Sequence, residues 1–189
     1  MNSAINSQTG KYDRIPVLDM GPYLAGEPGA REQLATQLRH VQENIGFYVV
    51  TNNGVDFSRL DAAYEALKKF FALPIDEKLK FSIDDTSLGY VPIRSTVYIT
   101  SIINENTKKD LNETLTLARE RPADHPAVKQ RRRFHGPNRW PEIEGFRDAV
   151  VAYQETIAAL GHNLLPLYAL ALDKPADFFD PYFNDPIMW

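Results

Sequence analysis

The N-terminal third of the chain changes from a helical to a strand-like pattern of apolar residues. Helical spacing joins Leu34, Leu38, Val41 and Ile45, and Gly46 follows as a residue type that commonly ends a helix. Residues 46–54 place aromatic and β-branched side chains before a closing Asn-Asn-Gly, which is typical of a buried strand that leads into a turn. We therefore expect a helix followed by a buried strand.

A second helical pattern follows this strand. Ser58, with Asp61 three residues later, fits an N-terminal cap. One face of the expected helix carries Leu60, Tyr64, Leu67 and Phe71. Pro74 ends this helix. Residues 73–79 predict a turn that leads into one more short helix, with Pro74 near its first position.

Strand-like patterns are shorter and more scattered. Residues 15–20 predict an edge strand, because Pro16 cannot donate to a ladder. Residues 82–96 predict an irregular loop. Two strands are expected after it, over Val97–Ile103 and Leu111–Leu117.

A long helix is expected from Phe146 onward. Its apolar face carries Phe146, Val150, Tyr153, Ile157, Leu160, Leu164 and Tyr168. Pro166 should kink it, because proline lacks a backbone donor. The aromatic residues Phe178, Phe179, Tyr182 and Phe183 predict a last short helix that packs on this face.

Composition places the chain among globular proteins of one domain, or of one domain with a partial second. It has 189 residues, 43% of them hydrophobic and 24% charged. The net charge of -4 gives no reason to expect nucleic acid or an anionic membrane as partner. Cysteine is absent, which excludes disulfides and thiolate sites and agrees with the cytoplasmic location that we expect. Neither a signal-peptide core nor a membrane-length apolar run occurs.

Candidate chemistry is sparse. The chain has four histidines, at positions 40, 125, 135 and 162, and no pair has metal-ligand spacing. His40 and His162 fall outside their apolar stripes, which indicates surface positions. His125 and His135 lie in a proline-rich stretch and are interpreted as incidental. We expect neither a catalytic nor a metal-ligating set in this chain.

Arg131, Arg132 and Arg133 form a basic run between residues 119 and 141. One interpretation is an anion-binding loop. The acidic charge of the whole chain favours a solvated surface loop instead.

Six short motifs occur in a fixed order. They are Ile15-Pro16-Val17-Leu18-Asp19; Gly46 to Val55; Phe70-Phe71-Ala72-Leu73-Pro74 with Glu77-Lys78; Gly89-Tyr90; Asp110-Leu111-Asn112-Glu113; and Pro137-Asn138-Arg139-Trp140-Pro141 with Phe146-Arg147. In this order the chain resembles the N-terminal region of the isopenicillin N synthase-like, non-haem iron(II)/2-oxoglutarate-dependent oxygenases.

The resemblance implies an oxidoreductase that couples oxidative decarboxylation of 2-oxoglutarate to oxidation of a small molecule, although isopenicillin N synthase itself uses no 2-oxoglutarate. It also implies that the H-x-D and distant histidine ligands of Fe(II), and the Arg-x-Ser motif for 2-oxoglutarate, belong to strands beyond this chain. We therefore expect residues 1–189 to bind neither cofactor and to be inactive alone. One departure is Asn52-Asn53-Gly54, where the family usually has Asn-His-Gly.

The fold implied is α/β, with helices packed on a few strands that form the N-terminal part of an incomplete double-stranded β-helix, or jelly-roll. The expected organisation is a flexible tail over 1–12, the dioxygenase N-terminal domain over 13–118, a Pro/Arg-rich connection over 119–144, and a long helix with the start of the absent catalytic jelly-roll over 145–189.

The segment after Gly89 resembles the part of the family that approaches the active-site mouth. We therefore predict Tyr90, Arg94 and Tyr98 as substrate-binding residues, the alternative being packing tyrosines and a solvated arginine. Two other functions remain open: a short non-catalytic homologue that binds a partner, and an anion-binding α/β module. The expected partners are a small-molecule substrate and either the missing jelly-roll or a second copy bound through exposed apolar surface.

Overall fold

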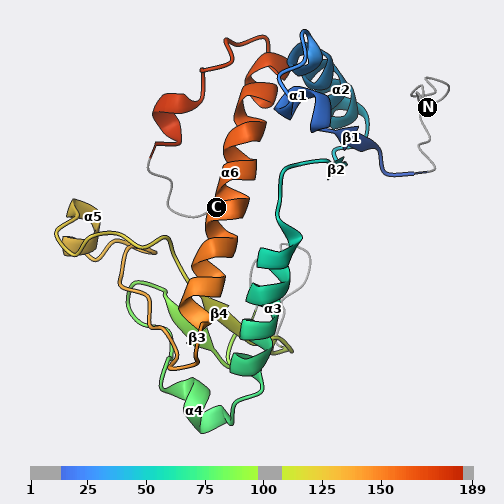
Figure 1. Cartoon of the computed structure of the whole chain (residues 1–189). Helices are drawn as coiled ribbons and strands as arrows, with labels where there is room; N and C mark the ends of the chain where they lie inside the picture. The colour runs from blue at the N-terminus through green and yellow to red at the C-terminus, as the bar shows by residue number, and fades with distance from the viewer. Residues whose placement is uncertain (1–13, 98–107, 185–189) are drawn as a thin grey trace. The chain divides into compact units, whose positions relative to one another are not determined.

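The computed structural model describes residues 14–97 and 108–184. These residues form two compact units. The first unit combines the segment up to Val55 with residues 157–184, and the second contains residues 56–156. Helix α6 (Phe146–Ala171) contributes to both units (Figure 1). The α/β class is therefore confirmed.

The first unit packs helices on one side of a two-stranded sheet. Its elements are β1 (Val17–Asp19), α1 (Gly21–Leu24), α2 (Ala30–Asn44), β2 (Val49–Thr51), the later part of α6 and the 3-10 helix η1 (Asp180–Tyr182). β1 and β2 run parallel, with Leu18 opposite Val50. Gly46 has a φ of 81° just after α2, which confirms its predicted place at the helix end.

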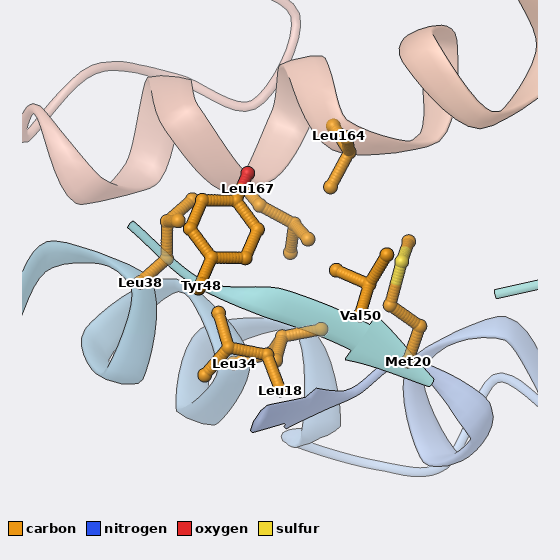
Figure 2. A pocket seen from close by; sticks show the side chains of 8 residues that line it. All are labelled: Leu18, Met20, Leu34, Leu38, Tyr48, Val50, Leu164 and Leu167. Atoms are coloured by element: carbon orange, nitrogen blue, oxygen red, sulfur yellow. The ribbon is translucent and has the colours of Figure 1, made fainter. Parts of the chain in front are cut away.

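The core of this unit lies between the sheet and two helices. Figure 2 shows side chains of β1 and β2 directed toward α2 and α6. The crevice that they line is apolar and too narrow to admit a water molecule; its walls are Leu18, Met20, Leu34, Leu38, Tyr48, Val50, Leu164 and Leu167. It is a packed core, with no polar group on its walls except the Tyr48 ring's hydroxyl.

One carboxylate ties the ends of the two strands together. Asp19 Oδ1 accepts a hydrogen bond from the Gly21 N–H at 2.9 Å and from Asn52 Nδ2 at 2.9 Å. Both bonds lower the pKa of Asp19, and the bond from Asn52 has the larger effect. Asn52 has a φ of 50°, a conformation that asparagine tolerates better than most residues. Two of the sequence motifs are thus joined by Asp19 and Asn52.

The end of α6 is held by α2. Arg39 donates from Nε to the carbonyl oxygen of Ala171, and its Nη2 lies 2.6 Å from Asp173 Oδ2. Asp173 has a φ of 57°, and the Lys174 N–H donates to the Ala169 carbonyl at 2.9 Å. This is a Schellman-type end with aspartate at the left-handed position. The helix continues through Pro166.

The second unit is built around an antiparallel strand pair. Its elements are α3 (Phe57–Phe71), α4 (Ile75–Leu79), β3 (Gly89–Val91), β4 (Thr114–Thr116), α5 (Pro126–Lys129) and the first part of α6. Tyr90 of β3 lies opposite Leu115 of β4. The buried core of this unit consists of Ala66, Phe70, Tyr90, Phe146 and Val150.

Several local predictions differ from the structure. The N-cap of α3 is Asp56, whose Oδ1 accepts from the Ser58 N–H at 2.9 Å, so the predicted cap at Ser58 is wrong by two residues. The buried stripe of α3 runs through Ala66 and Phe70, whereas Tyr64 is exposed. The strands of the sheet select this face, because Tyr90 packs against Phe70.

The strand predictions also need correction. β3 lies inside the segment predicted as an irregular loop, because pairing with β4 orders it. β4 confirms the predicted strand within Leu111–Leu117. Val97 lies outside any strand, and the rest of the predicted strand to Ile103 lies outside the described residues. The rings of Phe178, Phe179, Tyr182 and Phe183 contact one another, and the first unit's core as described does not include them.

Candidate functional site

Tyr90, the first of the predicted substrate-binding residues, lies in the core of the second unit. Its side chain is fully buried, and its ring packs edge-on against Phe70 with centroids 5.8 Å apart. Its hydroxyl donates a hydrogen bond to Glu113 Oε2. The structure therefore gives Tyr90 a packing role, and contact with a substrate stays a prediction.

Lys78, Tyr90 and Glu113 form a polar network in which Lys78 and Tyr90 are buried and Glu113 is partly exposed. Lys78 Nζ donates to Glu113 Oε2 at 2.8 Å and to the carbonyl oxygen of Phe71 at 3.1 Å. The ammonium group also lies 5.5 Å from the centroid of the Tyr90 ring. The network joins α4, β3, the segment before β4 and the end of α3.

Each ionisable group of the network has a shifted pKa. The hydrogen bond from Lys78 is the main cause of a lowered pKa at Glu113, and the hydrogen bond from Tyr90 lowers it further. The Glu113 bond raises the pKa of Lys78 despite its burial. Burial, followed by the bond to Glu113, raises the pKa of Tyr90. At neutral pH the network therefore contains a carboxylate, an ammonium ion and a neutral phenol.

Arg94 lies in a tight turn after β3. Its φ of 61° is in the left-handed region, where a non-glycine residue is uncommon. Backbone bonds hold the turn: the Arg94 N–H donates to the Asp110 carbonyl at 2.9 Å, and the Asp110 N–H donates to the Thr96 carbonyl at 3.0 Å. The Arg94 side chain is exposed and makes no hydrogen bond or ion pair with the described residues.

Of the three predicted residues, the structure thus describes two in contrasting settings. Tyr90 is buried and bonded, and Arg94 is exposed on a turn that is fixed on both sides. Tyr98 lies outside the described residues. A substrate role for Arg94 is a proposal that its position supports.

The arginine side chains of the basic run make contacts within the second unit. Arg131 donates to both carboxylate oxygens of Asp85, with Nε at 2.8 Å from Oδ2. Arg132 Nε donates to Gln130 at 2.8 Å, and the Arg133 guanidinium lies 4.6 Å from the Phe134 ring centroid. These contacts favour the interpretation of this stretch as a structured surface loop.

Two loop histidines have structural contacts. His125 is the N-cap of α5, and its Nδ1 accepts from the Ala127 N–H at 3.3 Å. His135 is buried, and its Nδ1 lies 2.8 Å from the Arg133 carbonyl oxygen. In residues 14–97 and 108–184 there is no group of three or more side chains of the kinds that hold a metal. The described residues therefore do not fit an iron site.

The sequence motifs contain contacts that pattern reasoning missed. Glu113 and Lys78 both stand in the quoted motifs, but only the fold shows that they pair. Glu120 likewise accepts from Trp140 Nε1 at 2.6 Å and from Arg147 Nη2 at 2.5 Å. These bonds attach the loop to the start of α6.

Comparison with known proteins gives a consistent result. Residues 15–143 match the family described as non-haem dioxygenase in morphine synthesis N-terminal. The chain is 31% identical over 172 residues to the 2-oxoglutarate-Fe(II) type oxidoreductase hxnY of Emericella nidulans, covering 88% of this chain and 48% of that protein. It is also 31% identical over 169 residues to Kihadalactone A synthase LFS of Citrus sinensis, again covering 88% and 48%.

Solved structures show the same fold. A protein of Caulobacter crescentus, described as belonging to the 2OG-Fe(II) oxygenase family, matches with a TM-score of 0.72 and 26% identity over 88% of this chain and 51% of its own. A full-length Neurospora crassa protein, solved in complex with alpha-KG, shares the fold with a TM-score of 0.69 at 21% identity, over 90% of this chain and 52% of its own. The chain spans about half the length of these relatives.

The match over residues 15–143 covers more than half of the chain and contains all the motifs up to Pro141. This chain therefore belongs to the non-haem dioxygenase N-terminal family, the N-terminal region of the iron(II)/2-oxoglutarate-type oxygenases.

Proposed function

We propose that this chain is the N-terminal half of an iron(II)- and 2-oxoglutarate-dependent oxidoreductase that acts on a small molecule. The family match over residues 15–143 carries the proposal, and relatives named as 2-oxoglutarate-Fe(II) oxidoreductases support it. In this proposal the strands are the N-terminal part of a jelly-roll that a longer polypeptide completes.

When bound, the two cofactors supply the oxidising chemistry. The described residues offer no ligand set for iron, so their proposed part is structural support and substrate contact. The Lys78–Glu113–Tyr90 network holds β3, and the turn after β3 presents Arg94. A guanidinium group there has the geometry to bind a substrate carboxylate through two hydrogen bonds.

The proposal is tested on the full polypeptide that contains this chain. With Fe(II) and 2-oxoglutarate it should form succinate, and the rate should rise when the correct small molecule is added. Residues 1–189 alone should form none and should show only weak, non-saturating heat when titrated anaerobically with Fe(II). A saturable one-to-one site in the short chain, lost on His125→Ala or His135→Ala, would contradict the assignment of iron to the other half.

We propose that the protein acts in the cytoplasm. Among residues 14–97 and 108–184, no helix combines the length and the apolarity needed to cross a membrane.

A further inference from the structure

Positive charge is concentrated at the end of helix α5. Residues 129–133, which we call the cationic loop, have the sequence Lys-Gln-Arg-Arg-Arg, and all five side chains are exposed. The whole chain has a net charge of -4, so the loop carries the opposite sign. Like charges at this spacing repel one another, which lowers the stability of the folded state unless a counter-charge lies nearby.

One of the four cations has an acidic partner. Arg131 donates to both carboxylate oxygens of Asp85, with Nε at 2.8 Å from Oδ2. The hydrogen bond from Arg131 also lowers the pKa of Asp85, so this carboxylate is charged at neutral pH. Arg132, by contrast, bonds through Nε to the neutral amide oxygen of Gln130 at 2.8 Å.

The other two cations have no carboxylate beside them. The Arg133 guanidinium lies over the Phe134 ring, 4.6 Å from its centroid. Within residues 14–97 and 108–184, neither Arg133 nor Lys129 makes a side-chain hydrogen bond or an ion pair. Three positive charges of the cationic loop are therefore not compensated by a described acid.

Elsewhere the chain commonly places an acid beside its basic side chains. The residues whose side chains form ion pairs with a carboxylate include Arg31, Arg39, Arg59, Lys68, Lys78, Lys80 and Arg147. The cationic loop departs from this pattern over adjacent positions, which indicates that the missing counter-charge comes from a ligand.

The backbone of the loop is strained and tightly held. Arg131 has a φ of 48° and Phe134 a φ of 62°, both in the left-handed region that non-glycine residues rarely adopt. The Phe134 N–H donates to the Thr86 carbonyl at 2.7 Å, and the Arg132 N–H donates to the Ala127 carbonyl at 3.0 Å. Strain that the surrounding structure maintains is characteristic of binding sites. The loop therefore needs little further ordering to receive a ligand.

The spacing of the charges selects among anions. A guanidinium group fits phosphate and carboxylate through two parallel hydrogen bonds. A phosphate group carries a charge of about -1.5 to -2 near neutral pH, so two linked phosphates compensate three cations within one small molecule. An acidic peptide carries one charge per residue and would have to order several flexible side chains to do the same.

We infer that the cationic loop binds a small molecule that carries two or more linked phosphate groups. The inference goes beyond the proposed function and is independent of it, because no step uses iron, 2-oxoglutarate or the other half of the relatives. Arg132, Arg133 and Lys129 supply the positive charge, and the bond between Arg131 and Asp85 fixes the loop.

The test is a calorimetric titration of the 189-residue chain with tripolyphosphate at low salt. Heat should saturate at one anion per chain, and affinity should fall as sodium chloride is added, because exposed charges are screened. Inorganic phosphate should bind at least tenfold more weakly. The double variant Arg132→Gln/Arg133→Gln should weaken tripolyphosphate binding at least tenfold.

Two further variants separate charge from geometry. Arg132→Lys/Arg133→Lys keeps both charges but loses the planar fork, so it should weaken binding at least threefold and less than the glutamine variant. Lys69→Gln/Lys174→Gln is the matched control, because it removes two exposed charges outside the loop and should leave the affinity unchanged.

Asp85→Asn should have the opposite effect. It removes the negative charge beside Arg131, so tripolyphosphate should bind at least twofold more tightly. A loop whose arginines are merely solvated gives no such gain. Unchanged or weaker binding, with the variant folded by circular dichroism, would contradict the inference.

Other results would also overturn it. They are the absence of saturable heat with tripolyphosphate, an equal loss of affinity in the control variant, and binding of triglutamate or inorganic phosphate as tight as that of tripolyphosphate. If the glutamine variant fails to fold, the lysine variant and Asp85→Asn decide the question. Succinate formation by the full polypeptide reports on the proposed function separately.

Discussion

Asn138 bonds both backbone groups of Ala118 with its side-chain amide. Its Oδ1 accepts from the Ala118 N–H at 2.9 Å, and its Nδ2 donates to the Ala118 carbonyl at 2.7 Å. The amide thus acts as one more strand residue just beyond β4, and it fixes the proline-rich loop to the sheet. These two bonds need an acceptor and a donor on one side chain, which asparagine supplies within the Pro137–Pro141 motif.

Asn138→Asp should destabilise the second unit. The carboxylate has no donor for the Ala118 carbonyl and places negative charge against it, so we expect the free energy of unfolding to fall by about 1–3 kcal/mol. Urea denaturation of both variants measures this, with Gln37→Glu on the exposed side of α2 as the matched change from amide to acid. Equal losses in the two variants would mean that added charge, and not the lost pairing, causes the effect.

Lys78→Met and Glu113→Gln should each destabilise the fold, and their separate losses should sum to more than the loss in the double variant. Removing one partner leaves the other ion partly buried without its counter-charge, which costs about 3 kcal/mol for well-buried pairs and less here because Glu113 is partly exposed. A double-mutant cycle in urea should give a favourable coupling energy above about 0.5 kcal/mol. Additive losses would show that the two charges act independently.

The same pair should make stability depend on acid pH. The folded-state pKa of Glu113 lies below its ordinary value of 4.5, so its contribution is present above that pH and is lost as the pH falls through the folded value. The melting temperature of Glu113→Gln should accordingly fall less between neutral and acid pH than the melting temperature of the unmodified chain. Glu142→Gln, an exposed acid, is the control and should follow the unmodified chain. If the melting temperatures of the two variants and of the unmodified chain all fell equally at acid pH, this assignment would be wrong.

The departure from Asn-His-Gly at residue 53 should have little effect on stability. Asn53 Oδ1 accepts from the Val55 N–H at 3.0 Å, and His125 Nδ1 makes the same two-residue contact with Ala127. Asn53→His should therefore keep the turn and change the free energy of unfolding by less than about 0.5 kcal/mol, whereas Asn53→Ala should cost about 1 kcal/mol. Thermal denaturation at neutral pH compares the two, and an equal loss would show that histidine cannot replace this acceptor.

Arg94→Ala in the full-length enzyme should raise the Michaelis constant for the primary substrate. One lost charge-assisted bond is worth roughly 1.5–3 kcal/mol, or on the order of tenfold to a hundredfold. Affinity for Fe(II) and 2-oxoglutarate should not change. Arg31→Ala, an exposed arginine of α2 that pairs with Glu32, is the control and should leave all three constants unchanged. If Arg94→Ala weakened all three equally, the substitution would have damaged the fold.

The sequence by itself determined the family and the elements whose signals are local. The order of six motifs indicated the oxygenase N-terminal region, and the match over residues 15–143 confirms it. The spacing of apolar residues also located α2, α3 and α6, because a helix is specified by neighbours three and four residues apart. The end of α2 at Gly46 was also predictable locally, because glycine adopts a positive φ without strain.

Only the tertiary structure decided the contacts between distant residues. β3 was missed because three residues form a strand only when β4 is available to pair with them. The packing of Tyr90 against Phe70 and its hydrogen bond to Glu113 were likewise not indicated by the sequence. Asn138 bonds to Ala118, which is 20 positions away in the sequence, and Lys78 bonds to Glu113, which is 35 positions away. Periodicity does not report such pairs, because burial and hydrogen bonding depend on which surfaces the folded chain brings together.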